Sequence, residues 1–191
     1  MNIRNPKNTQ KQAGSAETME KLTGKKITPK YLAQSGAIAA IYVVLTLVFA
    51  PISFGSVQLR VAEALTILPL FTSAAIPGLF IGCLIANILG GGVVLDVIFG
   101  SLATLIGAAL RYVLRKNRWL VPIPTVVANT VIVPLVLRYG YGVDMPILLL
   151  AVYIAAGEVA GSYVLGELLG AILMKHRKQI FQEESDESGE G

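Results

Sequence analysis

Charged side chains are scarce in this sequence of 191 residues, because Asp, Glu, Lys and Arg make up only 15% of it. A soluble globular domain carries about 25%. Most of the charges lie at the two ends of the chain and in one short stretch near residue 115, so residues 31–174 are almost free of them. Such a stretch cannot supply the charged surface that a water-soluble fold needs. With 54% apolar residues and a mean hydropathy of +0.65, the sequence predicts an integral membrane protein.

Cysteine and histidine each occur once. Cys83 alone cannot form a disulfide within the chain, and no metal-ligand spacing is present. His176 lies in a basic stretch after the last apolar run, where it fits an interfacial cation. Intramembrane serine or metal chemistry needs a serine–histidine pair or several histidines. We therefore predict that the protein is not an enzyme and binds no metal or cofactor.

The net charge of +4 does not indicate nucleic-acid binding, because the cations cluster where apolar runs end. The first 30 residues are polar and basic and contain no apolar stretch. We expect no cleaved signal peptide, so that the first hydrophobic helix both targets the protein and stays in the membrane.

Six runs are apolar enough to be membrane-crossing helices, which need about 20 such residues. They are residues 32–50, 57–71, 74–89, 93–114, 119–138 and 146–174. The second run is the weakest, because it is short and contains two charges. It could instead form a re-entrant pair with the third run. The sequence thus predicts an all-α bundle of six transmembrane helices.

Lysines and arginines gather in three clusters: before the first run, after the sixth, and between the fourth and fifth at Arg111, Arg115, Lys116 and Arg118. Cytoplasmic segments of membrane proteins are enriched in these residues. Six crossings with a cytoplasmic N-terminus place every cluster in the cytoplasm, whereas five or seven would place one outside. We predict a multi-pass cell-membrane protein with both termini cytoplasmic. Residues 1–30 and 175–191 are expected to be disordered tails, the first basic and the second basic then acidic.

Ionisable groups inside a bilayer are costly, so each is a candidate functional residue. With two amides, they form the predicted substrate site: Arg60, Glu63, Asn87, Asp96, Asn129 and Glu158. At about 1.5 Å of rise per residue, most lie in the outer half of the bundle and Glu158 lies near the midplane. Small residues share the helix faces of both Asp96 and Glu158, which indicates that these acids point into the protein. A polar pocket open to the outside is expected.

Two alternatives concern the pairing of these groups. Arg60 and Glu63 are spaced i, i+3 and could pair with each other. Asp96 and Glu158 would then lack a basic partner and would favour a cation or a molecule rich in N–H donors. Asn129 could instead be a hydrogen-bonding bridge between helices. The GxxxG matches at 78–82 and 157–161 are weak signals on their own and favour internal packing.

Three segments resemble the QueT family: VQLRVAEAL at 57–65, AIPGLFIGC at 75–83 and DVIFGSLATL at 96–105. The likeness extends over about residues 31–174. Members of that family are substrate-binding (S) components of energy-coupling factor (ECF) transporters, assigned to the uptake of queuosine precursors. The resemblance implies a six-helix S-component bundle, and a 7-deazaguanine substrate such as preQ1 bound by the acids and amides named above.

The same resemblance implies partners: a transmembrane coupling protein and two ATPase subunits that supply the energy. In this chain no GxxxxGK[ST] phosphate loop is found. The first helix would offer the coupling protein a face of small residues, at Ala33, Gly36, Ala37 and Ala40. That face could alternatively pack inside the bundle.

A different class of function is a stand-alone, proton-coupled carrier of a small cationic or nucleobase-like solute, with Asp96 or Glu158 as its proton site. Such carriers often contain internal repeats, and none is visible here.

Overall fold

The computed structural model describes residues 28–54, 59–115 and 120–176. Within these ranges all regular structure is helical. The elements are α2 (Pro29–Val48), α3 (Ala50–Ser53), η1 (Val61–Leu70), α4 (Ala75–Leu89), η2 (Asp96–Gly100), α5 (Ser101–Leu114), α6 (Ile123–Tyr139), α7 (Ile147–Glu158), η4 (Val159–Leu165) and α8 (Gly166–Lys175). Both predicted tails, apart from their helical margins, and part of each basic cluster lie outside the described residues.

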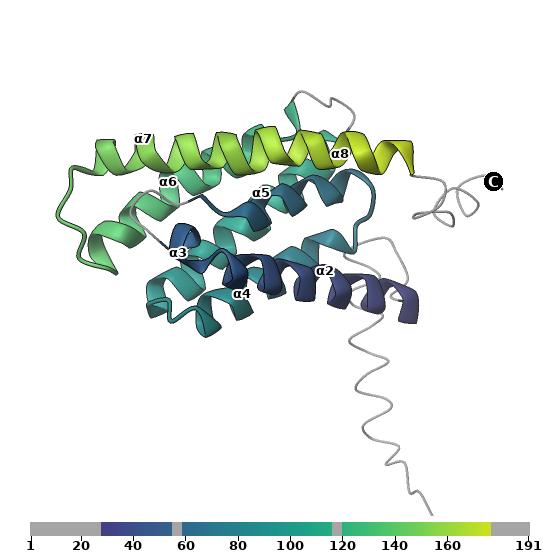
Figure 1. The fold of residues 1–191 in the computed structure, drawn as a ribbon, viewed down its shortest axis with the longest axis horizontal. Helices are drawn as coiled ribbons and strands as arrows, with labels where there is room; N and C mark the ends of the chain where they lie inside the picture. Colours follow the sequence, from purple (N-terminus) through teal and green to yellow (C-terminus); the bar gives the residue numbers. More distant parts are fainter. Residues whose placement is uncertain (1–27, 55–58, 116–119, 177–191) are drawn as a thin grey trace, which may run out of the picture.

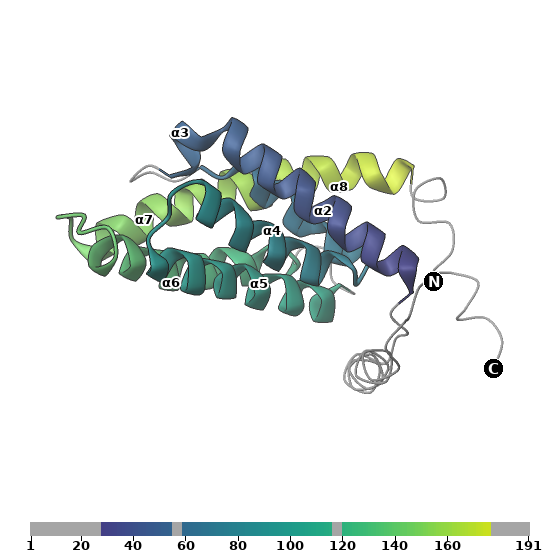
Figure 2. The same cartoon turned by 90° about the horizontal axis from the view of Figure 1, so that it is seen from below.

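Each of the six predicted apolar runs contains a helix. Three helical stretches are long and apolar enough to cross a membrane: Pro29–Val48, Asp96–Leu114 and Ile147–Lys175. The other three are shorter apolar helices, at Val61–Leu70, Ala75–Leu89 and Ile123–Tyr139. The elements run side by side along the long axis of the molecule, with the start of α2 and the end of α8 at the same end (Figures 1 and 2).

Local chemistry explains where the first helix begins and ends. The Oγ1 of Thr28 accepts a hydrogen bond from the amide of Tyr31 at 3.1 Å, and Pro29 occupies the first turn, where it removes no helical bond. The helix stops at Val48, and the short α3 follows with Pro51 in its own first turn.

Glycines allow α2 and α4 to pack closely. A Cβ atom added at Gly78 would lie 2.8 Å from the carbonyl oxygen of Ser35, and one at Gly82 would lie 2.8 Å from the Cβ of Tyr42. Likewise, a Cβ at Gly161 would lie 2.9 Å from the carbonyl oxygen of Arg60. The prediction that both GxxxG matches serve internal packing is therefore confirmed.

The second run forms a ten-residue 3₁₀ helix, η1, rather than an α-helix. Runs of 3₁₀ longer than three or four residues are uncommon. Pro69 lies inside this helix and cannot donate a backbone hydrogen bond. Its residues Ala62 to Pro69 are buried, so η1 lies within the bundle rather than on its surface.

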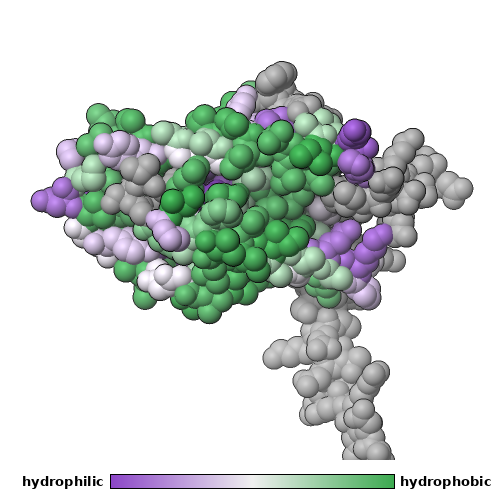
Figure 3. All heavy atoms as spheres, viewed as in Figure 1, coloured by the Kyte–Doolittle hydropathy of each residue, from purple (hydrophilic) through white to green (hydrophobic). Residues whose placement is uncertain are grey.

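The exterior of the molecule is far more apolar than that of a soluble protein. Leucine, isoleucine and valine side chains are exposed along α2, α4, α5, α6 and α7, and apolar residues cover the middle of the face seen in Figure 3. In the part of the chain that the structure describes, five Arg, Asp or Glu side chains are buried: Arg60, Glu63, Asp96, Arg111 and Glu158. An apolar exterior around a polar interior is what a bilayer requires.

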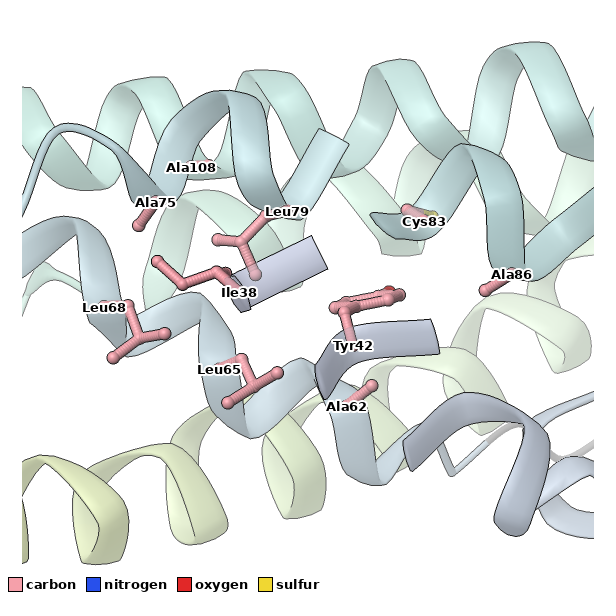
Figure 4. Close-up of a cluster of buried hydrophobic side chains, with 10 residues drawn as sticks. All are labelled: Ile38, Tyr42, Ala62, Leu65, Leu68, Ala75, Leu79, Cys83, Ala86 and Ala108. Atoms are coloured by element: carbon pink, nitrogen blue, oxygen red, sulfur yellow. The ribbon is translucent and has the colours of Figure 1, made fainter. Parts of the chain in front are cut away.

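The largest apolar cluster lies where α2, η1 and α4 meet, and it includes Ile38, Leu65 and Leu79 (Figure 4). Tyr42 and Cys83 belong to the same cluster, and both are fully buried. Through Tyr42 and Cys83, this cluster packs directly against the buried polar side chains Glu63 and Arg60.

Candidate functional site

All six side chains of the predicted site are buried. They come from different elements: Arg60 precedes η1, Glu63 lies in it, Asn87 is on α4, Asp96 begins η2, Asn129 is on α6 and Glu158 ends α7. The prediction that Asp96 and Glu158 point into the protein is confirmed, since they are 0% and 8% exposed.

One part of the site is an ion pair. Nη2 of Arg60 lies 3.6 Å from Oδ2 of Asp96. The alternative in which Arg60 pairs with Glu63 is wrong, as is the expectation that Asp96 has no basic partner. The spacing i, i+3 favours pairing on a regular helix. Arg60, however, lies just before the 3₁₀ helix with extended backbone angles. Its guanidinium pairs directly with Asp96 and interacts with Glu63 only electrostatically.

Several further groups hold Asp96 in place. Oη of Tyr141 donates to its Oδ2 at 2.8 Å, and Nδ2 of Asn87 donates to its backbone carbonyl at 3.2 Å. A Cβ at Gly100 would lie 2.5 Å from Oδ1 of Asp96. Any larger residue at this position would force the carboxylate to shift.

Tyr141 was not predicted from the sequence. It lies outside the membrane helices, in the connection between α6 and α7, next to Gly140 and to Gly142, whose φ of +68° favours glycine. Burial, and then the negative charge of Asp96, raise the pKa of Tyr141 to about 12. The phenol therefore remains protonated at neutral pH and acts as a hydrogen-bond donor.

Two further buried carboxylates belong to the site. Oε1 of Glu63 accepts a hydrogen bond from Tyr42 at 2.7 Å, and Oε1 of Glu158 accepts one from Nδ2 of Asn129 at 2.8 Å. Asn129 therefore does bridge two helices, α6 and α7, as the alternative interpretation expected. The residue it bridges to is a member of the predicted site.

Both predicted acids of the long helices lie at π-helical segments. Asp96 is the first residue of η2, and Glu158 immediately precedes η4. Such segments leave backbone groups displaced from the regular α-helical pattern and occur frequently at functional sites.

Arg111, which the sequence groups with the basic cluster between the fourth and fifth runs, is not a solvent-exposed cation. Its side chain is fully buried in α5, where Nη2 donates to the carbonyl oxygen of Pro122 at 3.2 Å and to Oγ of Ser162. It interacts electrostatically with Glu63, Glu158 and Glu167. A signal was present in the sequence, because Arg111 follows Gly107 by one turn on the face that carries Asp96.

Several buried polar atoms of the site have no hydrogen-bond partner among the described residues. They are Nε and Nη2 of Arg60, Oε2 of Glu63, Oδ1 of Asn87, Oδ1 of Asp96 and Oε2 of Glu158. Buried polar groups in native proteins nearly always have a partner. A group of such atoms in one part of the bundle indicates a place for a polar ligand.

The charge balance of the site differs from the predicted one. The buried groups are two guanidinium and three carboxylate side chains, so Arg60 offsets Asp96, and Arg111 lies near Glu63 and Glu158. With all five ionised, one negative charge is left. This balance still favours a cation or a ligand rich in N–H donors. Among the described residues, no group of three or more His, Cys, Asp or Glu side chains could hold a metal ion.

The small-residue face of α2 points away from the rest of the bundle. Ala33, Gly36, Ala37 and Ala40 are all exposed, and a Cβ at Gly36 would meet nothing within 4 Å. The alternative in which this face packs inside the bundle is therefore wrong. The opposite face of α2 holds Tyr42 and contacts the site through Glu63.

The apolar exterior and buried polar site fit a multi-pass membrane protein that binds a solute. Comparison with known families agrees. The family model described as "QueT transporter" matches residues 32–175, and the chain belongs to this transporter family. The family resemblance read from the sequence is thereby confirmed.

One curated relative is the "Queuosine precursor transporter QueT" of Lactococcus lactis subsp. cremoris (strain MG1363), 40% identical over 79 residues. The match covers 40% of this chain and 46% of that protein, so the aligned stretch spans less than half of the relative. No solved structure matches the chain.

Proposed function

We propose that this protein is the substrate-binding component of an ECF-type ABC transporter that captures a queuosine precursor, a 7-deazaguanine such as preQ1, outside the cell. The observation that carries the proposal is the group of buried Arg, Glu, Asp and Asn side chains with unpartnered atoms. A deazaguanine offers ring and exocyclic N–H donors to the carboxylates. In preQ1 the aminomethyl group adds one positive charge, which matches the negative charge left in the cluster.

The topology of this proposal is six membrane crossings with both termini in the cytoplasm of a cell-membrane protein. It is supported by the six apolar helices and by the position of the start of α2 and the end of α8 at one end of the bundle. Arg60, Asp96 and Tyr141 lie toward the opposite end, which in this topology faces outward. The basic clusters of the sequence give the orientation.

The partners in this proposal are a transmembrane coupling protein and two ATPase subunits. The exposed small-residue face of α2 supports the first of them, because small residues let a second helix approach closely in a bilayer. The protein itself hydrolyses no ATP. It delivers the bound precursor to the cytoplasm only together with these partners.

Isothermal titration of the purified full chain in detergent micelles tests the binding role. We expect heat and saturable binding with the aminomethyl precursor, the cyano precursor or both. If neither compound bound, the proposed substrate would be refuted.

Uptake measurements test the transport class. The radiolabelled precursor should enter cells only when the chain is co-expressed with the coupling protein and both ATPases. Uptake by the chain in a host without any ECF proteins, abolished by a protonophore, would instead show a stand-alone proton-coupled carrier.

A further inference from the structure

Three hydrogen-bond donors converge on one sulfur atom inside the bundle. Sγ of Cys83 lies 3.7 Å from Nη1 of Arg60, 3.7 Å from Nδ2 of Asn87 and 3.4 Å from Oγ1 of Thr104. These groups come from the start of η1, from α4 and from α5. A thiol sulfur is only a weak acceptor, so these donors have a poor partner.

The donors belong to side chains that are otherwise incompletely satisfied. Nε of Arg60 and Oδ1 of Asn87 have no hydrogen-bond partner among the described residues, and Nη2 of Arg60 has only its ion pair with Asp96. Arg60 is nevertheless only 6% exposed and Asn87 is fully buried. Thr104 has one hydroxyl proton, which it shares between Cys83 and the carbonyl oxygen of Gly100 at 3.2 Å. Leaving buried polar atoms unpaired is energetically costly, because they lose their hydrogen bonds to water without gaining others. A bound ligand would remove this cost.

The chemistry of the free atoms specifies what they can bind. The amide of Asn87 presents a donor at Nδ2 and an unpartnered acceptor at Oδ1, which is the complement of a lactam with its carbonyl oxygen next to an N–H. Arg60 and Thr104 add donors for the same carbonyl oxygen. No ionised carboxylate of the site can donate a hydrogen bond to this carbonyl oxygen, because ionised carboxylates only accept hydrogen bonds.

We propose that Arg60, Asn87 and Thr104 form a subsite around Cys83 that binds the lactam edge of the deazaguanine ring. When the ligand binds, the three donors exchange their weak contacts with Cys83 for hydrogen bonds to the ligand. This inference rests on the proposed function and assigns Cys83 and Thr104 to the site. It leaves Glu63 and Glu158 for the amino groups of the ligand.

The test compares two ligands: 7-aminomethyl-7-deazaguanine and its analogue with hydrogen in place of the 6-oxo group, which has no lactam edge. Both are titrated into the full chain in detergent by calorimetry. We expect the unmodified protein to bind the parent compound about tenfold or more tightly than the analogue, since one or two hydrogen bonds of typical net strength are lost.

Two substitutions at Cys83 should act in opposite directions. Cys83→Ser places a stronger acceptor among the three donors, so the parent compound must compete with it and should bind several-fold more weakly. Cys83→Ala removes the acceptor, so binding of the parent compound should be unchanged or tighter. Thr104→Val, which keeps the shape of the side chain, should weaken the parent compound several-fold and leave the analogue unchanged. Thermal unfolding of each variant in detergent serves as the folding control.

The inference would be overturned if the unmodified protein bound both compounds equally, or if Cys83→Ser bound the parent compound as tightly as Cys83→Ala. Equal losses for both ligands in Thr104→Val would also overturn it. In each of these cases the proposed function would stand, because the parent compound still binds. If the unmodified protein bound neither deazaguanine, the proposed function itself would fail and the subsite with it.

Discussion

Nη2 of Arg60 lies 3.6 Å from Oδ2 of Asp96, so the start of the 3₁₀ helix and the start of a π-helical segment are joined by a buried ion pair. The ring of Phe54 lies 5.7 Å from the Arg60 guanidinium carbon, within the range of a cation–π contact. This arrangement places a cation, an anion and an aromatic ring together at the proposed outer end of the bundle.

Asp96→Asn should weaken binding of the aminomethyl precursor by about 10- to 100-fold, because it removes a buried negative charge and leaves Arg60 unpaired. Calorimetric titration measures the change. The matched control is Asp144→Asn, which removes an aspartate that is 97% exposed and paired with Arg138 outside the site. Equal effects of the two substitutions would show that Asp96 has no specific role.

Glu158→Gln should reduce affinity for the aminomethyl precursor more than for the neutral cyano precursor. The amide oxygen can still accept the hydrogen bond from Asn129, so the helix contact is kept while the negative charge is lost. We expect the ratio of the two affinities to fall by about tenfold, corresponding to about 1.4 kcal/mol. An unchanged ratio would place the positive group of the ligand away from Glu158.

Arg111→Gln should destabilise the protein by about 3–5 kcal/mol, because it removes one member of a buried charged network and leaves Glu63 and Glu158 uncompensated. A marked fall in the unfolding temperature in detergent is the expected result. Arg115→Gln is the matched control, since Arg115 lies four residues on, is exposed and stacks on Tyr112 with its guanidinium carbon 4.2 Å from the ring centre. A fall of the same size for both variants would contradict the structural role of Arg111.

Gly36→Leu and Ala40→Leu should leave precursor binding intact and abolish uptake, because they add bulk to the exposed face of α2. The contrasting variant is Gly82→Leu, in which the new side chain would collide with Tyr42 and Ala39 inside the bundle. That variant should lose folded protein. Loss of binding in Gly36→Leu would mean that this face has a role within the protein.

The phenol of Tyr141 should ionise near pH 12 rather than at its ordinary value of 10.0. The raised pKa means that the folded state favours the protonated phenol, so its stabilising effect is present below pH 10 and is lost as the pH rises through about 12. The difference between the ultraviolet titration curves of the unmodified protein and Tyr141→Phe isolates this group. A difference centred near pH 10 would show that the phenol is not held in its buried position beside Asp96 in solution.

Much of the fold could be predicted from hydropathy alone. Runs of apolar residues determined the six helical segments, because a helix inside a bilayer satisfies its own backbone whatever its neighbours are. The long α7–η4–α8 stretch and the internal packing of Gly78 and Gly82 both followed from such patterns. The helix types of η1, η2 and η4 did not, since 3₁₀ and π segments arise from packing between elements.

The pairing inside the site could not be predicted for a related reason. Which carboxylate faces Arg60 depends on how η1 turns against η2, and the sequence spacing of Arg60 and Glu63 carries no information about that contact. The burial of Arg111 beside the site was missed because its proximity to a basic cluster outweighed its position on the face of Asp96. Tyr141 and Thr104 carry no charge signal, so only the three-dimensional contacts reveal them.

An experimental structure of the full chain with the aminomethyl precursor tests the central claim most directly. The account predicts ligand density between the Arg60–Asp96 pair and the two further carboxylates, Glu63 and Glu158, with Asn87 facing the ring. Density at any other place in the bundle, with the site side chains unchanged and making no contact to the ligand, would contradict it.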